Sequence, residues 1–304
     1  MKLPEGAMLA PRGGGRELTP MHRTALPLLL LAACSGSPPT PDDGGFVPSQ
    51  GCWEPSADSI FVQGLPSPTA GCGLTGQPTG VIDLRAAGLS TSGGLLVVPS
   101  GDATNPRALI LAFHGAGLTP EDIRGELQLE APADGGAIFV YPQATAGTWD
   151  ITAKSRDPTR VSDLIQQVAA RYCVDPARIY AAGFSAGAVF TLFLGCNVPG
   201  SFRAVGSVAG ADNRFDVSCC KPGLSAILIH GTGDDAIPFT AGQATAGGVA
   251  ARDGCSQNTQ PDGAHCSAYG CPVTQAVDFC PWFGKHEVPS WAGEEMWRFF
   301  DAAP

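Results

Sequence analysis

The sequence is poor in positive charge. Its 304 residues include 18 lysines and arginines against 28 aspartates and glutamates, which gives a formal net charge of −10 at pH 7. Proteins that bind nucleic acid or anionic lipid through their folded surface usually present a basic face. We therefore expect no nucleic-acid partner and no membrane contact through a charged surface, whereas a neutral substrate is compatible with this composition.

A metal-binding pattern of cysteines is also missing. The 11 cysteines include no Cys-x-x-Cys pair, and the adjacent Cys219 and Cys220 make a poor pair of ligands. We predict neither a metal nor another cofactor. So many cysteines are instead typical of an exported protein with disulfides. If Cys34 is set aside as a modification site, the others could form five bridges.

The cysteine spacing leaves the connectivity of these bridges open. Four cysteines lie close together near the C-terminus, and we expect them to pair largely with one another or with Cys219 and Cys220, in loops near the functional site. These four are Cys255, Cys266, Cys271 and Cys280.

The N-terminal region resembles a bacterial export signal. Residues 21–34 combine a short basic start, an apolar run and small residues before a cysteine. The apolar run is too short for a permanent membrane span. Residues 31–34, Leu-Ala-Ala-Cys, also resemble a lipobox, which would make Cys34 the lipidated first residue of a surface lipoprotein. The alternative is an ordinary signal peptide and free secretion.

The predicted organisation is a single folded domain behind a leader. Residues 1–33 are interpreted as the signal peptide, although residues 1–20 do not look like one and Met21 is an alternative start. Residues 34–51 are rich in Pro, Gly and Ser and predict a flexible tether. Residues 52–304 are long enough for one large α/β domain and show neither an internal repeat nor a second boundary.

Alternating strands and helices are predicted in this domain. Residues 107–113 form a continuous apolar run, as in a strand buried on both faces of a parallel sheet. Shorter runs of the same kind predict further strands. They cover residues 94–98, 137–141, 179–182, 204–208 and 226–229. The order of these segments indicates an α/β fold with a mainly parallel sheet.

Three helices have recognisable signals. Thr119, Pro120 and Asp122 have the types and spacing of an N-cap, a first-turn proline and a capping-box acid. Apolar residues recur with helical spacing over residues 161–172. The last helix places Met296, Phe299 and Phe300 on one face.

A Gly-x-Ser-x-Gly motif joins a predicted strand to a predicted helix at residues 183–187. A serine on so sharp a turn has a strained backbone, and side chains two residues to either side would collide with neighbouring atoms. These are the features of a nucleophile elbow with Ser185 as the nucleophile. A glycine-rich turn without catalytic function is the alternative, so the rest of the chain must supply a base, an acid and an oxyanion site.

The oxyanion site is predicted from two backbone N–H groups. His114 and Gly115 end the buried strand at residues 107–113, and an HG turn at this place supplies one N–H in α/β-hydrolases. We assign that N–H to Ala116, with Gly117 as the next candidate, and the second to Ala186. His114 itself is interpreted as a structural residue that holds the loop.

The acid and the base follow in the order expected for this fold. Asp234 comes after the strand at residues 226–229, and His286 lies before the last helix. His286 would take the proton of Ser185, and Asp234 would orient the imidazole. Asp235 is the competing acid and His265 the competing base. His230 is interpreted as a packing residue.

The ordered set of motifs resembles a known family. HGAG, VYPQA, VDPARIYAAGFSAG, FRAVGSVAG and HGTGDDAIPF together are similar to the secreted esterases that include polyhydroxybutyrate depolymerases and feruloyl or acetylxylan esterases. The resemblance covers most of residues 95–300 and implies an α/β-hydrolase fold, with Ser185, Asp234 and His286 as nucleophile, acid and base. The implied activity is that of an exported serine carboxylesterase, on polyester or plant cell-wall esters.

Around His286 the sequence departs from the family pattern. The family usually has His-x-Trp-Pro, whereas this chain has Val288 in place of the tryptophan, and Lys285 and Glu287 flank the histidine. This departure leaves the ester class open. Trp149, Trp282 and Trp291 could form an aromatic rim for a sugar or polymer, or could belong to the core. A catalytically silent, surface-tethered binding lipoprotein and a peptidase are the alternative functions.

Overall fold

The computed structural model describes residues 52–54, 65–89, 93–198, 200–215 and 217–304. All of them belong to the second of the two units into which the chain divides, Phe46–Pro304. The expected signal peptide (residues 1–33), the tether (34–51) and the lipidation site Cys34 lie outside the described residues. In the part that is described, no helix combines the length and the apolar character needed to cross a bilayer.

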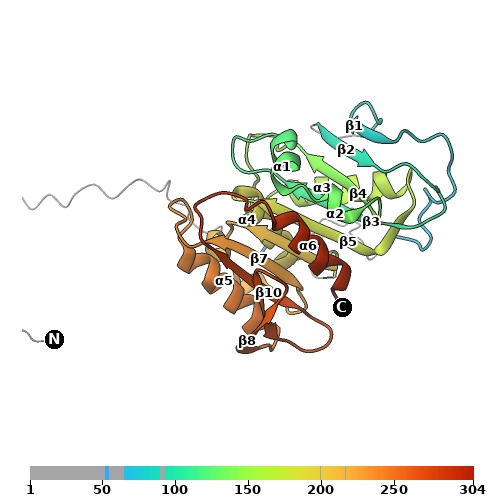
Figure 1. The fold of residues 1–304 in the computed structure, drawn as a ribbon. Coiled ribbons are helices and arrows are strands. Elements are labelled where there is room, and N and C mark those ends of the chain that lie inside the picture. The colour runs from blue at the N-terminus through green and yellow to red at the C-terminus, as the bar shows by residue number, and fades with distance from the viewer. Residues whose placement is uncertain (1–51, 55–64, 90–92, 199, 216) are drawn as a thin grey trace, which may run out of the picture. The chain divides into compact units, whose positions relative to one another are not determined.

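The described strands form one sheet of ten, in the order β1-β2-β4-β3-β5-β6-β7-β10-β9-β8 (Figure 1). Neighbouring strands from β4 to β10 in this order run parallel, and the strands at both ends of the sheet are antiparallel. The strands are β1 (Gly80–Asp83), β2 (Gly94–Val98), β3 (Arg107–Phe113), β4 (Ala137–Pro142), β5 (Val174–Phe184), β6 (Ala204–Val208), β7 (Ala226–Gly231), β8 (Ser256–Asp262), β9 (Cys266–Gly270) and β10 (Val277–Trp282). The mainly parallel sheet predicted from the sequence is confirmed.

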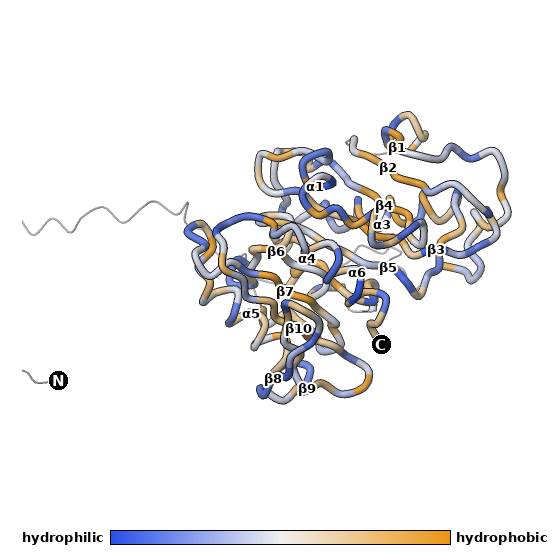
Figure 2. Tube along the Cα trace, viewed as in Figure 1, coloured by the Kyte–Doolittle hydropathy of each residue, from blue (hydrophilic) through white to orange (hydrophobic). Residues whose placement is uncertain are grey.

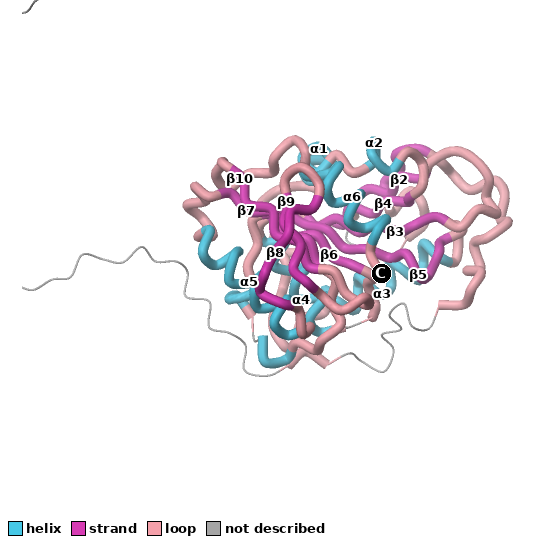
Figure 3. Tube along the Cα trace, turned by 60° about the horizontal axis from the view of Figure 1, so that its bottom comes forward, coloured by secondary structure: helices cyan, strands magenta, loops and turns pink. Residues whose placement is uncertain are grey.

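Helices cover both faces of this sheet. They are α1 (Pro120–Leu127), α2 (Glu130–Ala133), α3 (Asp157–Ala169), α4 (Ala186–Asn197), α5 (Phe239–Arg252) and α6 (Ala292–Ala302), with short 3₁₀ turns at Asp212–Arg214 and Val217–Cys219. Buried residues of α3, α4 and α5 belong to one apolar cluster, and those of α1, α2 and α6 belong to another. In Figure 3 the strands form a band with α1 and α2 on one side and α4 and α5 on the other.

The alternation of side chains along β3 shows why its run is continuously apolar. Leu109, Leu111 and Phe113 pack into the cluster with α3, α4 and α5. Ala108 and Ile110 point to the opposite cluster. A strand with helices on both faces has no side that water can solvate, so both sets must be apolar. Figure 2 shows apolar residues concentrated along the central strands.

The first helix begins as its sequence predicts. The hydroxyl of Thr119 accepts the backbone N–H of Asp122, whose carboxylate in turn accepts the N–H of Thr119, and Pro120 stands in the first turn. The helix expected over residues 161–172 begins and ends earlier in the chain, because α3 spans Asp157–Ala169. Tyr172 lies in the turn that follows α3. The next residue, Cys173, forms a disulfide with Cys72, and β5 begins directly after it at Val174.

Five disulfides connect the ten cysteines expected to pair. Two of them lie within the C-terminal group and fasten the antiparallel strands beside β10, whereas Cys219 and Cys220 bond elsewhere. The pairs are Cys52–Cys219, Cys72–Cys173, Cys196–Cys220, Cys255–Cys271 and Cys266–Cys280.

Candidate active site

Ser185 occupies the turn between β5 and α4. Its backbone has φ 53° and ψ −120°, a region that L-residues rarely adopt and that stores strain. A Cβ on Gly183 would overlap the backbone of Gly187, and a Cβ on Gly187 would overlap the carbonyl oxygen of Phe113. Both glycines of the motif are therefore required by close backbone contacts, as the sequence predicts.

A chain of hydrogen bonds connects Ser185 to two residues that lie far away in the sequence. His286 Nε2 is 2.8 Å from Ser185 Oγ. On the other side of the ring, His286 Nδ1 is 2.8 Å from Asp234 Oδ2 and 3.0 Å from Asp234 Oδ1. Because Nδ1 faces a carboxylate, it carries the proton, which leaves Nε2 able to accept the proton of the serine hydroxyl.

Asp234 is held firmly in the loop after β7. Its side chain is fully buried, and its Oδ1 accepts the backbone N–H groups of Ala236 and Ile237 at 2.9 and 2.8 Å. Asp235, the competing acid, is exposed and makes no bond to His286. The structure therefore brings Asp234, and not Asp235, to the histidine.

The loop that carries His286 is fastened to the loop of Asp234. The N–H of Thr232 donates to Trp282 O, and the N–H of Gly233 donates to Gly284 O, both at 2.8 Å. A Cβ on Gly231, at the end of β7, would overlap the carbonyl oxygen of Lys285. His265, the competing base, instead stacks on Trp291 with ring centroids 4.1 Å apart.

The HG turn after β3 lies directly beside the serine. A Cβ on Gly115 would be 3.4 Å from the Cβ of Ser185. The N–H of Gly117 is engaged, because it donates to Gly147 O at 2.8 Å. In the described residues, neither the N–H of Ala116 nor that of Ala186 has a hydrogen-bond partner. Ala186 is the first residue of α4, so its N–H belongs to the positive end of the helix.

His114 is buried and bonded to the loop backbone. Its Nδ1–H donates to Gly115 O at 2.7 Å, and its Nε2 accepts the N–H of Ala144 at 3.1 Å. Burial lowers the pKa of His114, which favours the neutral ring that this pattern requires. These bonds join the HG turn to the end of β4, so His114 shapes the turn without contacting the serine hydroxyl.

No family model matches the chain, but known esterases are similar to it in sequence. Feruloyl esterase C of Emericella nidulans is 30% identical over 266 residues, which is 80% of this chain and 93% of that protein. A probable feruloyl esterase C of Aspergillus flavus is 31% identical over 258 residues, or 77% and 92% of the two chains. This chain belongs to the feruloyl esterase C family. It is a carboxylic-ester hydrolase by that membership.

Two further similarities are weaker in sequence. Poly(3-hydroxyalkanoate) depolymerase C of Paucimonas lemoignei is 26% identical over 168 residues, which is 52% of this chain and 39% of that protein. The solved structure of an acetyl xylan esterase from Aspergillus awamori superposes with a TM-score of 0.55 at 16% identity, over 69% of this chain and 93% of that one. The structural likeness supports the α/β-hydrolase fold.

The tryptophans of this esterase do not form one exposed rim. Trp149 is buried, stacks on Phe190 and donates its indole N–H to His114 O at 2.8 Å. Trp282 and Trp291 are half-buried and pack against the cluster around α6. Val288, which stands in place of the family tryptophan, packs against the same cluster, so it adds no aromatic surface beside His286.

One contact at the site was not predicted. His230, interpreted from the sequence as a packing residue, is buried, and its Nε2–H donates to Ile237 O at 2.9 Å. The same nitrogen lies 3.3 Å from Asp234 Oδ2. His230 therefore supports the loop that holds the carboxylate. Its position at the end of β7, before a glycine, resembles that of His114 at the end of β3 and could have suggested such a role.

Proposed function

We propose that the protein is an exported serine esterase that cleaves ester groups of plant cell-wall polysaccharides, of the feruloyl or acetylxylan kind. The observation that carries this proposal is the hydrogen-bonded series Ser185–His286–Asp234. The similarity to feruloyl esterases over most of both chains favours this substrate class. The match to the polyester depolymerase is shorter and less identical.

In the first half of the reaction, Ser185 becomes acylated. Its Oγ attacks the carbonyl carbon of the ester while the hydroxyl proton passes to His286 Nε2. The carboxylate of Asp234 stabilises the imidazolium that forms. The carbon–oxygen bond to the alcohol then breaks, His286 returns the proton to the leaving oxygen, and an acyl-enzyme results.

The second half releases the acid. A water molecule takes the place of the alcohol and gives a proton to His286 Nε2 as its oxygen attacks the acyl carbon. Collapse of this second tetrahedral intermediate returns the proton to Ser185 Oγ and frees the carboxylic acid. The same imidazole therefore serves as base and acid in turn, which requires the fixed tautomer that Asp234 maintains.

The negative charge on the tetrahedral oxygen requires donors that are already in place. We assign this role to the N–H groups of Ala116 and Ala186, which lie on the HG turn beside Ser185 and on the first turn of α4. Removal of a single oxyanion-hole donor costs roughly 3–4 kcal/mol of transition-state stabilisation in acyl transfer. The engaged N–H of Gly117 leaves Ala116 as the donor from this turn.

The test of the serine mechanism is replacement of the nucleophile. We expect Ser185→Ala to abolish hydrolysis of p-nitrophenyl acetate and labelling by a fluorophosphonate probe, with an unchanged melting temperature. Undiminished turnover by this variant would refute the assignment of Ser185. A wild-type protein that is neither labelled nor active would instead favour the silent binding lipoprotein.

The substrate class is tested with a panel of esters. Methyl ferulate, acetylated xylan, hydroxybutyrate oligomers, triacylglycerols and a peptide amide separate the possible activities in one set of assays. We expect the highest kcat/KM on methyl ferulate or acetylated xylan. A clear preference for hydroxybutyrate oligomers would indicate a polyester depolymerase. A clear preference for the peptide amide would indicate a peptidase.

Export is proposed from the five disulfides, which are typical of oxidising compartments. Lipidation at Cys34 rests on the sequence of residues 31–34 alone. With a lipid anchor, globomycin should cause unprocessed precursor to accumulate in the producing bacterium. Normal processing in its presence would favour an ordinary signal peptide and free secretion.

A further inference from the structure

A cavity of about 260 Å³ lies at the end of the sheet opposite to Ser185. Among the residues that line it, Arg107 is the first residue of β3, and Cys173 directly precedes β5. Ser185 follows the last residue of β5. The seven residues of β3 span about 20 Å, so the cavity is separated from the ester-cleaving centre by the length of the parallel strands.

The walls of this cavity come from segments that are fastened to one another. The disulfide Cys72–Cys173 joins two of them. The hydroxyl of Tyr172 donates to Pro78 O at 3.1 Å, and the guanidinium of Arg107 donates to Pro99 O at 2.9 Å. A pocket braced in this way is pre-formed, so a ligand would not have to order it on binding.

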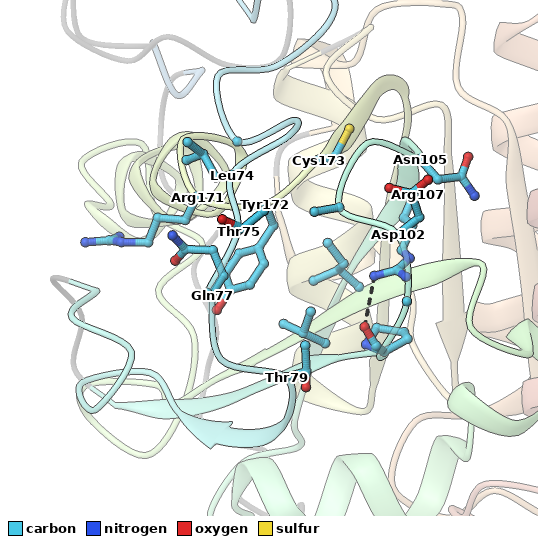
Figure 4. A pocket seen from close by; sticks show the side chains of 17 residues that line it. Leu74, Thr75, Gln77, Thr79, Asp102, Asn105, Arg107, Arg171, Tyr172 and Cys173 are labelled. Carbon is cyan, nitrogen blue, oxygen red and sulfur yellow. Dashed lines mark hydrogen bonds between the residues drawn. The ribbon is translucent and has the colours of Figure 1, made fainter.

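Polar groups with unused hydrogen-bonding capacity line this cavity. Figure 4 shows Asp102, Asn105 and Arg107 on one side and Gln77 with the ring of Tyr172 on the other. Val98 and Ile138 also line the cavity and are apolar. Within the described residues, the side-chain amides of Gln77 and Asn105 have no hydrogen-bond partner.

The acid on the wall is an acceptor. Two hydrogen bonds from Thr104, donated by its backbone N–H and its hydroxyl, hold the pKa of Asp102 below the ordinary value, so the group is a carboxylate. Both bonds reach Oδ1, which leaves Oδ2 for a ligand that donates. Arg107 on the same wall balances this charge, and Arg171 donates to Gly88 O and extends away from both in Figure 4.

We propose that this cavity binds a neutral sugar unit of a polysaccharide. Vicinal hydroxyls of a sugar both donate and accept, and they match a cavity that offers a carboxylate, an amide and a guanidinium on one side and a second amide on the other. The apolar C–H face of a sugar ring can pack against Leu74, which lines the cavity and is 42% exposed. A polyester offers carbonyl and ester oxygens but no donor along its chain, so it could not hydrogen-bond to the Asp102 carboxylate.

A second sugar site on the catalytic domain would hold a polymeric substrate while Ser185 acts on ester groups elsewhere along the same chain. Attachment at one point raises the effective concentration of the other sites on that chain. This inference goes beyond the proposed function and does not depend on it, because oligosaccharide binding can be measured in the absence of an ester.

The test measures binding of xylohexaose and cellohexaose to the exported protein by calorimetry. The double variant Gln77→Ala/Asn105→Ala removes two side chains whose loss leaves no internal partner unsatisfied, so its melting temperature should match that of the wild type. We expect its affinity for the sugar to fall about tenfold, as for the loss of two ordinary hydrogen bonds. Asn258→Ala, an exposed amide on β8, is the matched control and should bind as the wild type does.

A second variant, Thr79→Trp, places a large side chain at the cavity and should abolish sugar binding. None of these changes should alter hydrolysis of p-nitrophenyl acetate. The proposal is overturned if neither sugar binds, if Thr79→Trp binds as well as the wild type, or if hydroxybutyrate oligomers bind at this site and the sugars do not. If the Ser185→Ala variant remained active, the proposed serine mechanism would be wrong, but the measured binding of sugar to the cavity would be unaffected.

Discussion

The α-carbon of Gly187 lies against the carbonyl oxygen of Phe113, and a methyl group on Gly187 would overlap that oxygen. The first turn of α4 therefore packs directly against the last residue of β3. This close approach explains why Ser185 stands beside the HG turn, where a Cβ on Gly115 would be only 3.4 Å from that of Ser185. Ser185 and the HG turn are thus positioned by this backbone contact.

Replacement of Gly187 by alanine should therefore damage both the fold and the site. We expect a loss of about 3 kcal/mol or more in the free energy of unfolding, because the overlapping atoms belong to the backbone and cannot rotate away. Urea denaturation measures this loss. Gly125→Ala is the matched control, since Gly125 lies in α1 with open space around it, and alanine there should stabilise by roughly 0.5–1 kcal/mol. Equal effects of the two changes would contradict the argument.

The two neighbouring aspartates after β7 should differ sharply in their effect on turnover. Asp234→Asn replaces the carboxylate that holds the proton on His286 Nδ1, so the ring can present Nε2–H to Ser185 and lose its basic nitrogen. We expect kcat to fall by roughly 10³–10⁴-fold. Asp235→Asn changes an exposed side chain and should leave kcat within a factor of two. Steady-state hydrolysis of p-nitrophenyl acetate by both variants provides the comparison.

The central part of the fold could be predicted from sequence because its signals lie within short segments and agree with one another. The run at β3 is apolar on both faces, and the capping box at Thr119 pairs two side chains with the backbone over a single turn. Gly183 and Gly187 were predicted for the same steric reason that the structure shows. The apolar run and the capping box each depend on a few adjacent residues, and the two glycines are recognisable from their spacing around Ser185 although Gly187 contacts the distant Phe113.

The missed elements depend on contacts that are distant in sequence. β8 has a mainly exposed, polar sequence, SQNTQPD, and is held by pairing with β9 and by neighbouring disulfides, so it lacks an apolar pattern. α5 contains three glycines, which lower helix propensity, and it is stabilised by packing on the sheet. The contact of His230 with Asp234 requires the turn that follows β7, which the sequence pattern alone does not specify.

The disulfides predict a simple count of reactive thiols. Protein recovered from an oxidising compartment and denatured without reductant should react with iodoacetamide at no more than one cysteine, Cys34, whereas the paired cysteines should react only after dithiothreitol is added. Reaction of all the cysteines in the unreduced protein would contradict the five bridges.

One of these bridges should contribute to the stability of the strand that leads to His286. Cys266 and Cys280 are 14 residues apart, and Cys280 lies in β10. Loss of a bridge that closes a loop of this length costs roughly 3 kcal/mol. We expect the double variant Cys266→Ala/Cys280→Ala to unfold at a correspondingly lower urea concentration. An unchanged midpoint would show that strand pairing alone holds this region.

A buried carboxyl group far from the serine should make stability depend on pH. Asp278 in β10 is 2% exposed, and its Oδ2 has no hydrogen-bond partner in the described structure. Arg298 approaches it only to 3.8 Å, because the guanidinium is engaged by Asp262 at 2.9 Å and by Glu295 at 2.8 Å. Burial, with the neighbouring Asp262 as a second cause, raises the pKa of Asp278 to about 7.

The sign of this pH dependence follows from whether the folded or the unfolded chain binds more protons. Between the ordinary aspartate pKa of 3.8 and about 7, Asp278 is protonated in the folded chain and ionised in the unfolded one, so stability falls as pH rises through this window. We expect the free energy of unfolding, measured with urea, to be roughly 2–3 kcal/mol lower at pH 8 than at pH 5. Asp278→Asn keeps a neutral group of the same shape and should flatten this dependence, whereas Asp301→Asn, in an exposed ion pair with Arg178, should not. If Asp278→Asn retains the wild-type slope, Asp278 is not the group whose protonation makes stability depend on pH in this range.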